Sequence, residues 1–280
     1  MGPSILPTKS ISCHICYDIR RIFHKEAFMQ PDDRKKEILE YLEKNQYMSV
    51  EELARAVFAS EPTIRRDLAQ MEREGLISRK RGGASFISSE KMNFPFAFRN
   101  RANIDKKNYI AGLAAAYVRE GDFIFLDSSS TCYCLARHLA AFSHLKVLTH
   151  GIPALQVLGK KEGITAECVC GTYHPQRDDF SGYEACEYIA TRHARISFIS
   201  CQGLNVTSGV TEYLVDDAAL KKAFHRNSDQ TILLIDSSKV GRAVHYQTMP
   251  LKELTAIVTD QPLPEDLAVY CEAHHIEVVY

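Results

Sequence analysis

The sequence predicts an α/β protein with two parts, a small winged helix-turn-helix domain and a larger, doubly wound α/β domain. Residues 34–87 contain three short amphipathic helices followed by a hairpin with a glycine pair. Beyond them, seven short apolar runs alternate with helical stretches, which is the pattern of a mostly parallel sheet covered on both faces. A chain of 280 residues is long enough for each part to bury its own core.

The first two helices have helix-turn-helix spacing. The first is expected at Arg34–Asn45, and the second begins at the capping box Ser49-x-x-Glu52. Only a short turn separates the second helix from Ser60, where a third begins. The inward-facing apolar residues are Ile38, Leu39 and Leu42 in the first helix and Val50, Leu53, Ala54 and Val57 in the second.

The third helix has an apolar face and a polar face. Ser60 can cap it, Pro62 fits its first turn, and Gly75 is expected to end it. Its apolar residues, spaced i, i+4 and i+7, are Ile64, Leu68 and Met71. The polar residues of the opposite face and its flank, which we predict to contact DNA, are Ser60, Thr63, Arg65, Arg66, Gln70 and Arg73.

A basic hairpin follows the third helix. Residues 76–87 alternate around the turn Gly82-Gly83, which places Arg79, Lys80 and Arg81 at the wing of the domain. These three residues are the predicted phosphate contacts of the wing.

Charge is segregated along the chain, although the net charge is only −1. Residues 31–59 contain five Lys or Arg against seven Asp or Glu, whereas residues 60–85 contain six against four. The basic surplus falls on the third helix and the wing, where phosphates would lie. The alternative is a solvated helix face on which Arg65 and Arg66 pair with Glu61, Asp67 or Glu74. Because cap, periodicity, helix end and basic wing agree, DNA binding is favoured.

The remaining chain predicts a Rossmann-like, doubly wound domain. We expect the winged helix at 31–88, a linker with Pro95 at 89–104, and the α/β domain at 105–280. In such folds ligands bind beyond the carboxyl ends of the strands. The expected strands are 123–127, 145–149, 166–170, 196–200, 231–236, 256–260 and 276–280, and the expected helices are 106–119, 131–142, 218–226 and 265–274.

Polar residues cluster at several of these strand ends. Ser129, Ser130 and Thr131 lie between the first strand and a helix, where unbonded amides and the helix dipole attract anions. The alternatives are an ordinary helix cap at this loop and a surface pair between Asp236 and Lys239. Convergence of the strand ends favours an anionic ligand. The predicted ligand-binding residues are Asp127, Ser129, Ser130, Thr131, Thr149, His150, Gly171, Asp236 and Lys239.

The first part resembles the DNA-binding region of the DeoR family of bacterial sugar-operon regulators. The resemblance rests on residues 34–84, above all TIRRDL at 63–68 and GGA at 82–84. It implies that Ser60, Thr63, Arg65 and Arg66 lie at the major groove. Arg81 stands where the family usually has His, which keeps the wing cationic.

The second part resembles the sensor domain of the same family, whose fold is similar to ribose-5-phosphate isomerase. Asp127, Ser130 and Thr131 match its D-x-G-S-T-like loop, and residues 236–241 match its D-x-S-K-[FV]-G motif. Ser129 and His150 replace the usual Gly and Asn. Thr149 and Gly171 match one member each of a Thr-Asn and a Gly-Gly pair. The resemblance implies a phosphorylated sugar as effector, and DSSSTCYCLARHL at 127–139 with FISCQGL at 198–204 resembles the L-fucose-operon branch.

We therefore expect a regulator of a sugar-catabolic operon whose partners are operator DNA, a phosphorylated sugar and further copies of itself, as a homodimer or homotetramer. The alternative is an isomerase-like enzyme fused to a DNA-binding head; the Lys-Gly-Gly-Gly-Gly segment of such isomerases is absent, and we assign no catalytic residue and no cofactor. No signal peptide and no apolar run of membrane-spanning length is evident, so a cytoplasmic location without membrane contact is expected.

Two groups of cysteines allow a metal site to be considered. In the tail at 1–30, whose role is unassigned, Cys13, Cys16 and His24 form half of a zinc-like pattern, but a disordered or loosely docked tail is favoured. The second group, Cys132, Cys134, Cys168 and Cys170, has no usual zinc spacing, and buried thiols are the favoured interpretation. No metal ligand is therefore predicted.

Overall fold

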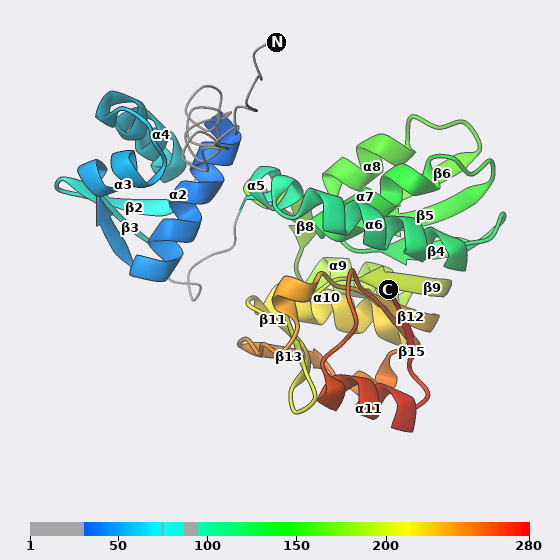
Figure 1. The fold of residues 1–280 in the computed structure, drawn as a ribbon. Helices are drawn as coiled ribbons and strands as arrows, with labels where there is room; N and C mark the ends of the chain where they lie inside the picture. The colour runs from blue at the N-terminus through cyan, green and yellow to red at the C-terminus, as the bar shows by residue number, and fades with distance from the viewer. Residues whose placement is uncertain (1–30, 74–75, 87–94) are drawn as a thin grey trace, which may run out of the picture. The chain divides into compact units, whose positions relative to one another are not determined.

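The structure is a computed structural model that describes residues 31–73, 76–86 and 95–280. These residues form two compact units that divide between residues 92 and 93 (Figure 1). The tail cysteines Cys13 and Cys16, His24 and the predicted helix end at Gly75 lie outside the described residues.

The first unit is a winged helix. Ser49 Oγ accepts the Glu52 N–H at 3.2 Å and Glu52 Oε2 accepts the Ser49 N–H at 2.8 Å, which confirms the capping box. The turn of the hairpin lies one residue earlier than predicted, at Arg81 and Gly82, where Gly82 has φ +82°. Its elements are α2 (Pro31–Asn45), β1 (Tyr47–Ser49), α3 (Val50–Ala56), α4 (Glu61–Arg73), β2 (Ile77–Lys80) and β3 (Gly83–Phe86).

A short sheet joins the wing to the three helices. Strand β1, which the sequence did not predict, pairs antiparallel with β3 and gives the order β1-β3-β2. The three helices bury one face each against one another and against this sheet. The predicted inward residues are buried except Ala54, which is half-buried: Ile38, Leu39, Leu42, Val50, Leu53, Val57, Ile64, Leu68 and Met71.

The second unit contains a seven-stranded sheet in the order β15-β14-β12-β9-β4-β5-β6, in which every neighbouring pair is parallel. All seven predicted strands are present. The strands are β4 (Phe123–Leu126), β5 (Leu145–Thr149), β6 (Ile164–Cys168), β9 (Ala194–Ile199), β12 (Ser228–Leu234), β14 (Ala256–Val258) and β15 (Glu277–Val279).

Helices cover both faces of this sheet. α6, α7 and α8 form one layer and α9, α10 and α11 the other. Successive strand residues alternate between the two cores: Leu126 and Phe198 pack in the first, Phe125 and Ile199 in the second. The helices are α6 (Ile104–Ala114), α7 (Ser130–Leu139), α8 (Ile152–Leu158), α9 (Tyr183–Ala190), α10 (Val215–Arg226) and α11 (Glu265–Ala273).

The predicted linker at 89–104 contains a helix, α5 (Phe96–Arg101), that belongs to the second unit. The rings of Phe96 and Tyr133 on α7 meet edge to face with centroids 5.5 Å apart. The Phe96 N–H also donates to the Gln176 carbonyl at 2.8 Å. Residues 96–101 of the predicted linker are therefore helical and packed on α7.

The second unit also contains smaller elements that the sequence did not predict. They are the hairpin β7 (Thr172–His174) and β8 (Asp179–Ser181), the antiparallel sheet of β10 (Gly203–Asn205), β11 (Gly209–Glu212) and β13 (Tyr246–Met249), and the 3-10 turns η2 (Ala115–Tyr117), η3 (Ser237–Lys239) and η4 (Leu251–Glu253). Among the described residues, no helix has the length and apolar character to cross a membrane.

The strand order reverses between β4 and β9. β5 and β6 follow β4 on one side, whereas β9 and then β12 lie on the other. Loops leaving β4 and β9 therefore diverge at a topological switch point, which is where doubly wound folds bind ligands.

Candidate functional site

The predicted DNA-contacting face of α4 is exposed. Ser60 Oγ lies 2.8 Å from Thr63 Oγ1 and 3.4 Å from the Thr63 N–H, so the two side chains meet at the helix start. Arg66, Gln70 and Arg73 lie on the surface, opposite the buried Ile64, Leu68 and Met71. This arrangement leaves the polar face available to a groove of DNA.

The acidic residues considered as partners of the α4 arginines take different positions. Asp67 is buried, and its Oδ2 lies 2.6 Å from Arg34 Nε of α2, so it fixes α4 to α2. Glu61 pairs with Arg65 at 3.0 Å across one exposed helical turn. An exposed pair of this kind contributes little free energy and can yield to a phosphate. Glu74 lies outside the described residues.

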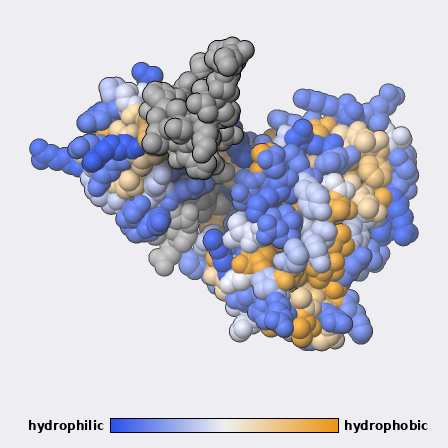
Figure 2. All heavy atoms as spheres, viewed as in Figure 1, coloured by the Kyte–Doolittle hydropathy of each residue, from blue (hydrophilic) through white to orange (hydrophobic). Residues whose placement is uncertain are grey.

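The wing carries its cations at the tip of the β2–β3 hairpin. Lys80 and Arg81 are exposed, whereas Arg79 lies 3.8 Å from the Glu72 carboxylate and donates its N–H to Glu72 at 3.2 Å. Figure 2 shows the hairpin tip, at the far left of the view, as a hydrophilic projection. The tip thus offers two cations, and Arg79 also fixes the hairpin to α4.

Asp127, directly after β4, organises the switch point. Its side chain is 0 % exposed, Oδ1 accepts the Ser129 N–H at 2.8 Å, and Oδ2 accepts the Ser200 N–H at 2.7 Å. Burial alone would raise the pKa of Asp127, but Lys221, 3.5 Å away, and these hydrogen bonds keep it below its usual range. Asp127 therefore positions the loop through these contacts, and its predicted contact with a ligand stays a prediction.

The loop ends in the N-terminus of α7. Ser129 caps this helix, since its Oγ accepts the Cys132 N–H at 3.1 Å, and Ser130 is buried in the first turn. The first amides of a helix have no acceptor within it and carry its positive dipole end. Thr131 is fully buried, and its Oγ1 has no hydrogen-bond partner among the described residues.

Three further buried oxygens at this edge also have no hydrogen-bond partner within the described part of the chain. They are Ser200 Oγ, after β9, Asp236 Oδ2, after β12, and Thr259 Oγ1, after β14. A buried polar atom without a partner is costly unless a ligand or water satisfies it. Three such atoms follow β4, β9 and β12, which makes the switch point the strongest candidate for a ligand site.

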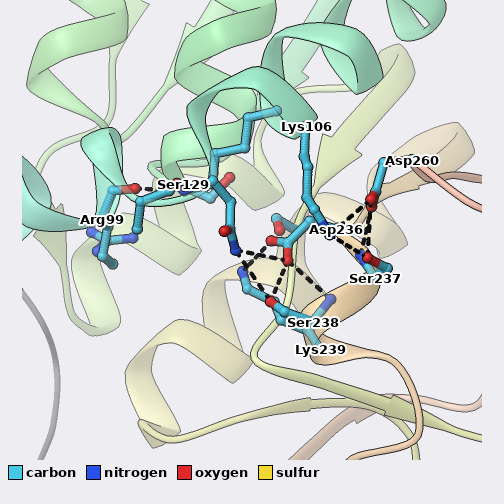
Figure 3. Close-up of polar contacts among 12 residues, drawn as sticks. Arg99, Lys106, Ser129, Asp236, Ser237, Ser238, Lys239 and Asp260 are labelled. Atoms are coloured by element: carbon cyan, nitrogen blue, oxygen red, sulfur yellow. Dashed lines mark hydrogen bonds and ion pairs between the residues drawn. The ribbon is translucent and has the colours of Figure 1, made fainter. Parts of the chain in front are cut away.

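The segment after β12 supplies charge to the same edge (Figure 3). Asp236 Oδ1 accepts hydrogen bonds from the Ser238 N–H at 3.1 Å, from the Ser238 hydroxyl and from Asn103 Nδ2 at 3.3 Å. Lys239 Nζ lies 4.0 Å from Asp236 Oδ2. The predicted Asp236/Lys239 pair therefore exists, and Asn103 of the α5–α6 corner joins it.

Two lysines of α6 contact this segment in different ways. Lys106 Nζ lies 3.1 Å from the Asp260 carboxylate and donates to Ser237 Oγ at 2.6 Å. This ion pair and hydrogen bond fix α6 to the strand ends. Lys107 is buried and donates to the carbonyls of Arg99 and Ala102. Burial and the nearby Lys239 lower the pKa of Lys107 to about 8.

Thr149 and His150, predicted as ligand contacts, are buried and satisfied within the protein. Thr149 Oγ1 accepts the Gly151 N–H at 3.1 Å. His150 Nε2 accepts the Ser128 N–H at 2.9 Å, and its Nδ1 donates to the Phe180 carbonyl at 3.2 Å. Burial holds the pKa of His150 below its usual value, so the ring is neutral. Both residues shape the loops of the edge through these bonds, and their predicted contact with a ligand stays a prediction.

Gly171, the remaining predicted residue, allows two backbone segments to approach. It has φ +131°, and a Cβ there would lie 2.6 Å from the Ser181 carbonyl oxygen. Its role is to seat the β7–β8 hairpin. That hairpin is held to the edge by Asp179, which accepts from Ser128 Oγ at 2.9 Å and from Arg177 at 3.1 Å.

The structure thus brings Ser129, Ser130, Thr131, Asp236 and Lys239 to one edge, as predicted, and adds residues that sequence reasoning missed. The missed residues are Arg99, Asn103, Lys106, Lys107 and Ser200. The basic run RNRANIDKK at 99–107 contains Arg99, Asn103, Lys106 and Lys107 and could have indicated an anion-binding segment. The predicted boundary between linker and helix divides this run.

The four cysteines considered as a second metal group differ in exposure. Cys132 and Cys134 are buried, as predicted, but Cys168 is half-buried and Cys170 is exposed, so that part of the expectation is wrong. Among the described residues, His, Cys, Asp and Glu form no cluster of three or more that could hold a metal ion.

Comparison with known proteins gives matches in both units. Residues 34–90 match the DeoR-like helix-turn-helix domain, and residues 102–261 match the DeoR C terminal sensor domain. The chain is 34% identical to the uncharacterized HTH-type transcriptional regulator YulB of Bacillus subtilis, over 82% of this chain and 89% of that protein. It is 32% identical to the L-fucose operon activator of Haemophilus influenzae, over 86% of this chain and 97% of that protein.

Among solved structures, ribose-5-phosphate isomerase A of Methanocaldococcus jannaschii matches with a TM-score of 0.37 and 16% identity, over 50% of this chain and 55% of that one. A likeness at this level says nothing about activity.

Proposed function

Because the chain belongs to the DeoR family of helix-turn-helix transcriptional regulators, we propose that it binds operator DNA through α4 and the wing and a phosphorylated sugar at the β4–β9 switch point. The regulated genes would form a sugar-catabolic operon. The observation that carries the ligand proposal is that three buried oxygens, on Thr131, Ser200 and Asp236, lie at the ends of β4, β9 and β12 without a hydrogen-bond partner among the described residues.

The DNA-binding residues fall into two classes by position. Ser60, Thr63, Arg65, Arg66, Gln70 and Arg73 lie on α4 or its cap, where side chains reach base edges and flanking phosphates. Arg79, Lys80 and Arg81 lie on the wing and would contact phosphates, which adds affinity without adding sequence preference.

The phosphate would lie against the first turn of α7. There the amides of Ser130 and Thr131 and the helix dipole favour an anion, Thr131 Oγ1 offers a hydrogen bond, and Lys239 offers a charge. Ser200 Oγ and Asp236 Oδ2 are suited to the hydroxyl groups of the sugar, since one can donate and both can accept. Asp127, Thr149, His150 and Gly171 would act indirectly, by holding these loops in place.

The enzyme alternative has less support. An isomerase needs a base beside the substrate carbon, and Asp236 is the nearest candidate, but its Oδ1 is already bonded to Ser238 and Asn103. The relatives that match most of the chain are named as transcriptional regulators. Their names and the winged helix favour a sensor that binds its ligand without turnover.

The protein would act as a homo-oligomer in the cytoplasm. Figure 2 shows hydrophobic residues gathered on the second unit around α11, where Val269 is 60% exposed, and a homodimer or homotetramer would cover such a surface. Paired heads would also raise the affinity for a two-half-site operator, which the net charge of −1 does not supply by itself. DNA and phosphorylated sugars meet in the cytoplasm, where the protein would act.

The test is a thermal-shift screen of the full chain against phosphorylated sugars, each paired with its unphosphorylated form. A ligand at 100 times its dissociation constant should add about 2.7 kcal/mol of stability. Each hit is then assayed for turnover and for its effect on binding to the promoter region of the adjacent genes. Stabilisation by phosphorylated forms alone, with altered DNA binding and no product, is expected. Product formation would support the enzyme alternative, and a screen without any hit would contradict the ligand proposal.

A further inference from the structure

Glu72, near the end of α4, contacts Arg79 of the wing in two ways. Its Oε1 accepts the Arg79 backbone N–H at 3.2 Å, and its Oε2 lies 3.8 Å from Arg79 Nη1. Strand β2 is an outer strand of the sheet β1-β3-β2, and Glu72 supplies an acceptor along its edge. One carboxylate therefore both holds the edge of the wing and pairs with a cation that we propose to contact phosphate.

A second acidic residue of α4 holds a proposed DNA-contacting cation in a similar way. Glu61 Oε2 lies 3.0 Å from Arg65 Nη2. Glu61 and Glu72 are eleven residues apart on the helix, which is about three turns, so they lie along one side of α4. That side flanks the polar face that carries Arg66. Both ends of this flank thus place a carboxylate against a cation.

The other cations of the proposed DNA surface differ from these two. Among the described residues, Arg66, Lys80 and Arg81 have no carboxylate partner. The side chains of Arg79 and Glu72 are 42% and 45% exposed, so water screens their attraction and the pair adds little to folding stability. Its effect is therefore expected where a second anion, a phosphate of DNA, competes for Arg79.

A phosphate at Arg79 would bring DNA close to Glu72. Because the two side chains lie 3.8 Å apart, that phosphate would lie within a Debye length of the carboxylate, about 8 Å at physiological ionic strength. Like charges at this separation repel, and Arg79 has to give up part of its pairing with Glu72 to bind the phosphate. The pair carries no net charge, so it releases fewer counterions from DNA than an arginine without a partner would.

We propose that Glu72 limits the affinity of this protein for DNA of any sequence by holding Arg79 at the edge of the wing. The inference rests on the proposed function, because it requires Arg79 to lie near phosphate. It assigns a role to a residue outside the proposed DNA contacts. Glu72 restrains the sequence-independent contribution of the wing, and tight binding then depends more on the reading face, where Arg66 has no such restraint.

The experiment compares Glu72→Gln with Glu72→Ala in the full chain. Glutamine keeps an oxygen that can accept the Arg79 N–H and removes only the charge, whereas alanine removes both. Binding is measured by fluorescence anisotropy on a labelled duplex of random sequence over a range of salt concentrations. We expect Glu72→Gln to tighten binding about fivefold or more at low salt, and to steepen the slope of log affinity against log salt by about one unit.

The matched control is Glu40→Gln, which makes the same change of charge on an exposed residue of α2, a helix without a proposed DNA contact. It should change the affinity by less than about twofold, because screening weakens a charge that lies farther from the phosphates. An equal gain in affinity for Glu40→Gln would overturn the inference, since net charge alone would then be responsible. Unchanged or weaker binding by Glu72→Gln would overturn it as well.

Hydrogen exchange of the Arg79 amide tests how Glu72 holds the wing. The amide should stay protected in Glu72→Gln and should exchange faster in Glu72→Ala. Equal protection in both variants and the unaltered protein would contradict the proposed hold on the edge of β2. If the unaltered protein bound neither the random duplex nor the promoter region of the adjacent genes, the proposed function itself would be contradicted.

Discussion

The carboxylate of Asp127 accepts the backbone N–H of Ser200 at 2.7 Å and so joins the ends of β4 and β9 at the switch point of the sheet. The same side chain orders the start of α7 through Ser129 and lies beside the ammonium group of Lys221. One buried residue therefore determines where the amides of the candidate ligand site point.

Replacing Asp127 with Asn should cost about 3 kcal/mol of stability, because it leaves a buried Lys221 with fewer partners and sets an amide donor against a backbone N–H. The measurement is urea unfolding followed by a probe of the second unit. The control is Asp229→Asn, which removes an exposed partner of His193 and should change stability by less than about 0.5 kcal/mol. Equal stabilities of the two variants would contradict the structural role given to Asp127.

Arg66→Ala should reduce operator affinity by about 1 to 3 kcal/mol if its side chain reads a base edge, and the loss should be smaller on non-operator DNA. The control is Arg55→Ala, on the exposed surface of α3, where Arg55 pairs with Glu51 at 3.4 Å. Binding is measured by fluorescence anisotropy on operator and scrambled duplexes. An unchanged ratio of the two affinities would remove Arg66 from the reading face.

Arg81→Ala should weaken binding to operator and scrambled DNA by similar factors, because a wing cation contacts phosphate rather than base. The slope of log affinity against log salt should become shallower by about one unit. A salt titration of both duplexes checks this, and a loss confined to the operator would show that Arg81 reads sequence.

The sequence predicted the seven parallel strands because a strand buried on both faces is a continuous apolar run, as at 123–126 and 232–235. It predicted the three helices of the winged helix because caps and periodicity coincide there. The hairpin β7–β8 and helix α5 were missed since their apolar residues are few and their positions depend on tertiary contacts, such as that between Phe96 and Tyr133.

The sequence predicted where the candidate site lies, but it did not predict which side chains point toward it. Strand ends indicate which residues lie at one edge, but they do not indicate which way a side chain turns. Thr149 and His150 turn into the protein, whereas Ser200, at the end of a predicted strand, leaves its hydroxyl at the edge without a hydrogen-bond partner among the described residues. Only the folded chain brings residues 99–107 against residues 236–239.

Thr131→Val should weaken effector binding by about 1 kcal/mol or more, since it keeps the shape of the side chain and removes the hydroxyl. Ser130→Glu should abolish the response to the effector, because a carboxylate at the helix start repels a phosphate. Both variants should bind operator normally without ligand. The thermal shift with the phosphorylated sugar identified by the screen measures this, and a normal shift for both would leave the loop as a helix cap alone.

His150 should make stability depend on pH. Its ring is neutral in the folded protein because burial lowers its pKa below the ordinary 6.5, and its Nε2 accepts the Ser128 N–H. The unfolded chain takes up a proton as pH falls below about 6.5, whereas the folded protein resists until the lower pKa is reached. The contribution of His150 is therefore fully present above pH 6.5 and is lost as pH falls through the folded-state value.

The test replaces His150 with Asn, whose amide does not titrate. The free energy of unfolding of His150→Asn should fall less between about pH 6.5 and 5 than that of His193→Asn, which serves as an exposed control. An identical pH dependence in both variants would mean that His150 is protonated in the folded protein, and the bond from Ser128 would then have to be reassigned.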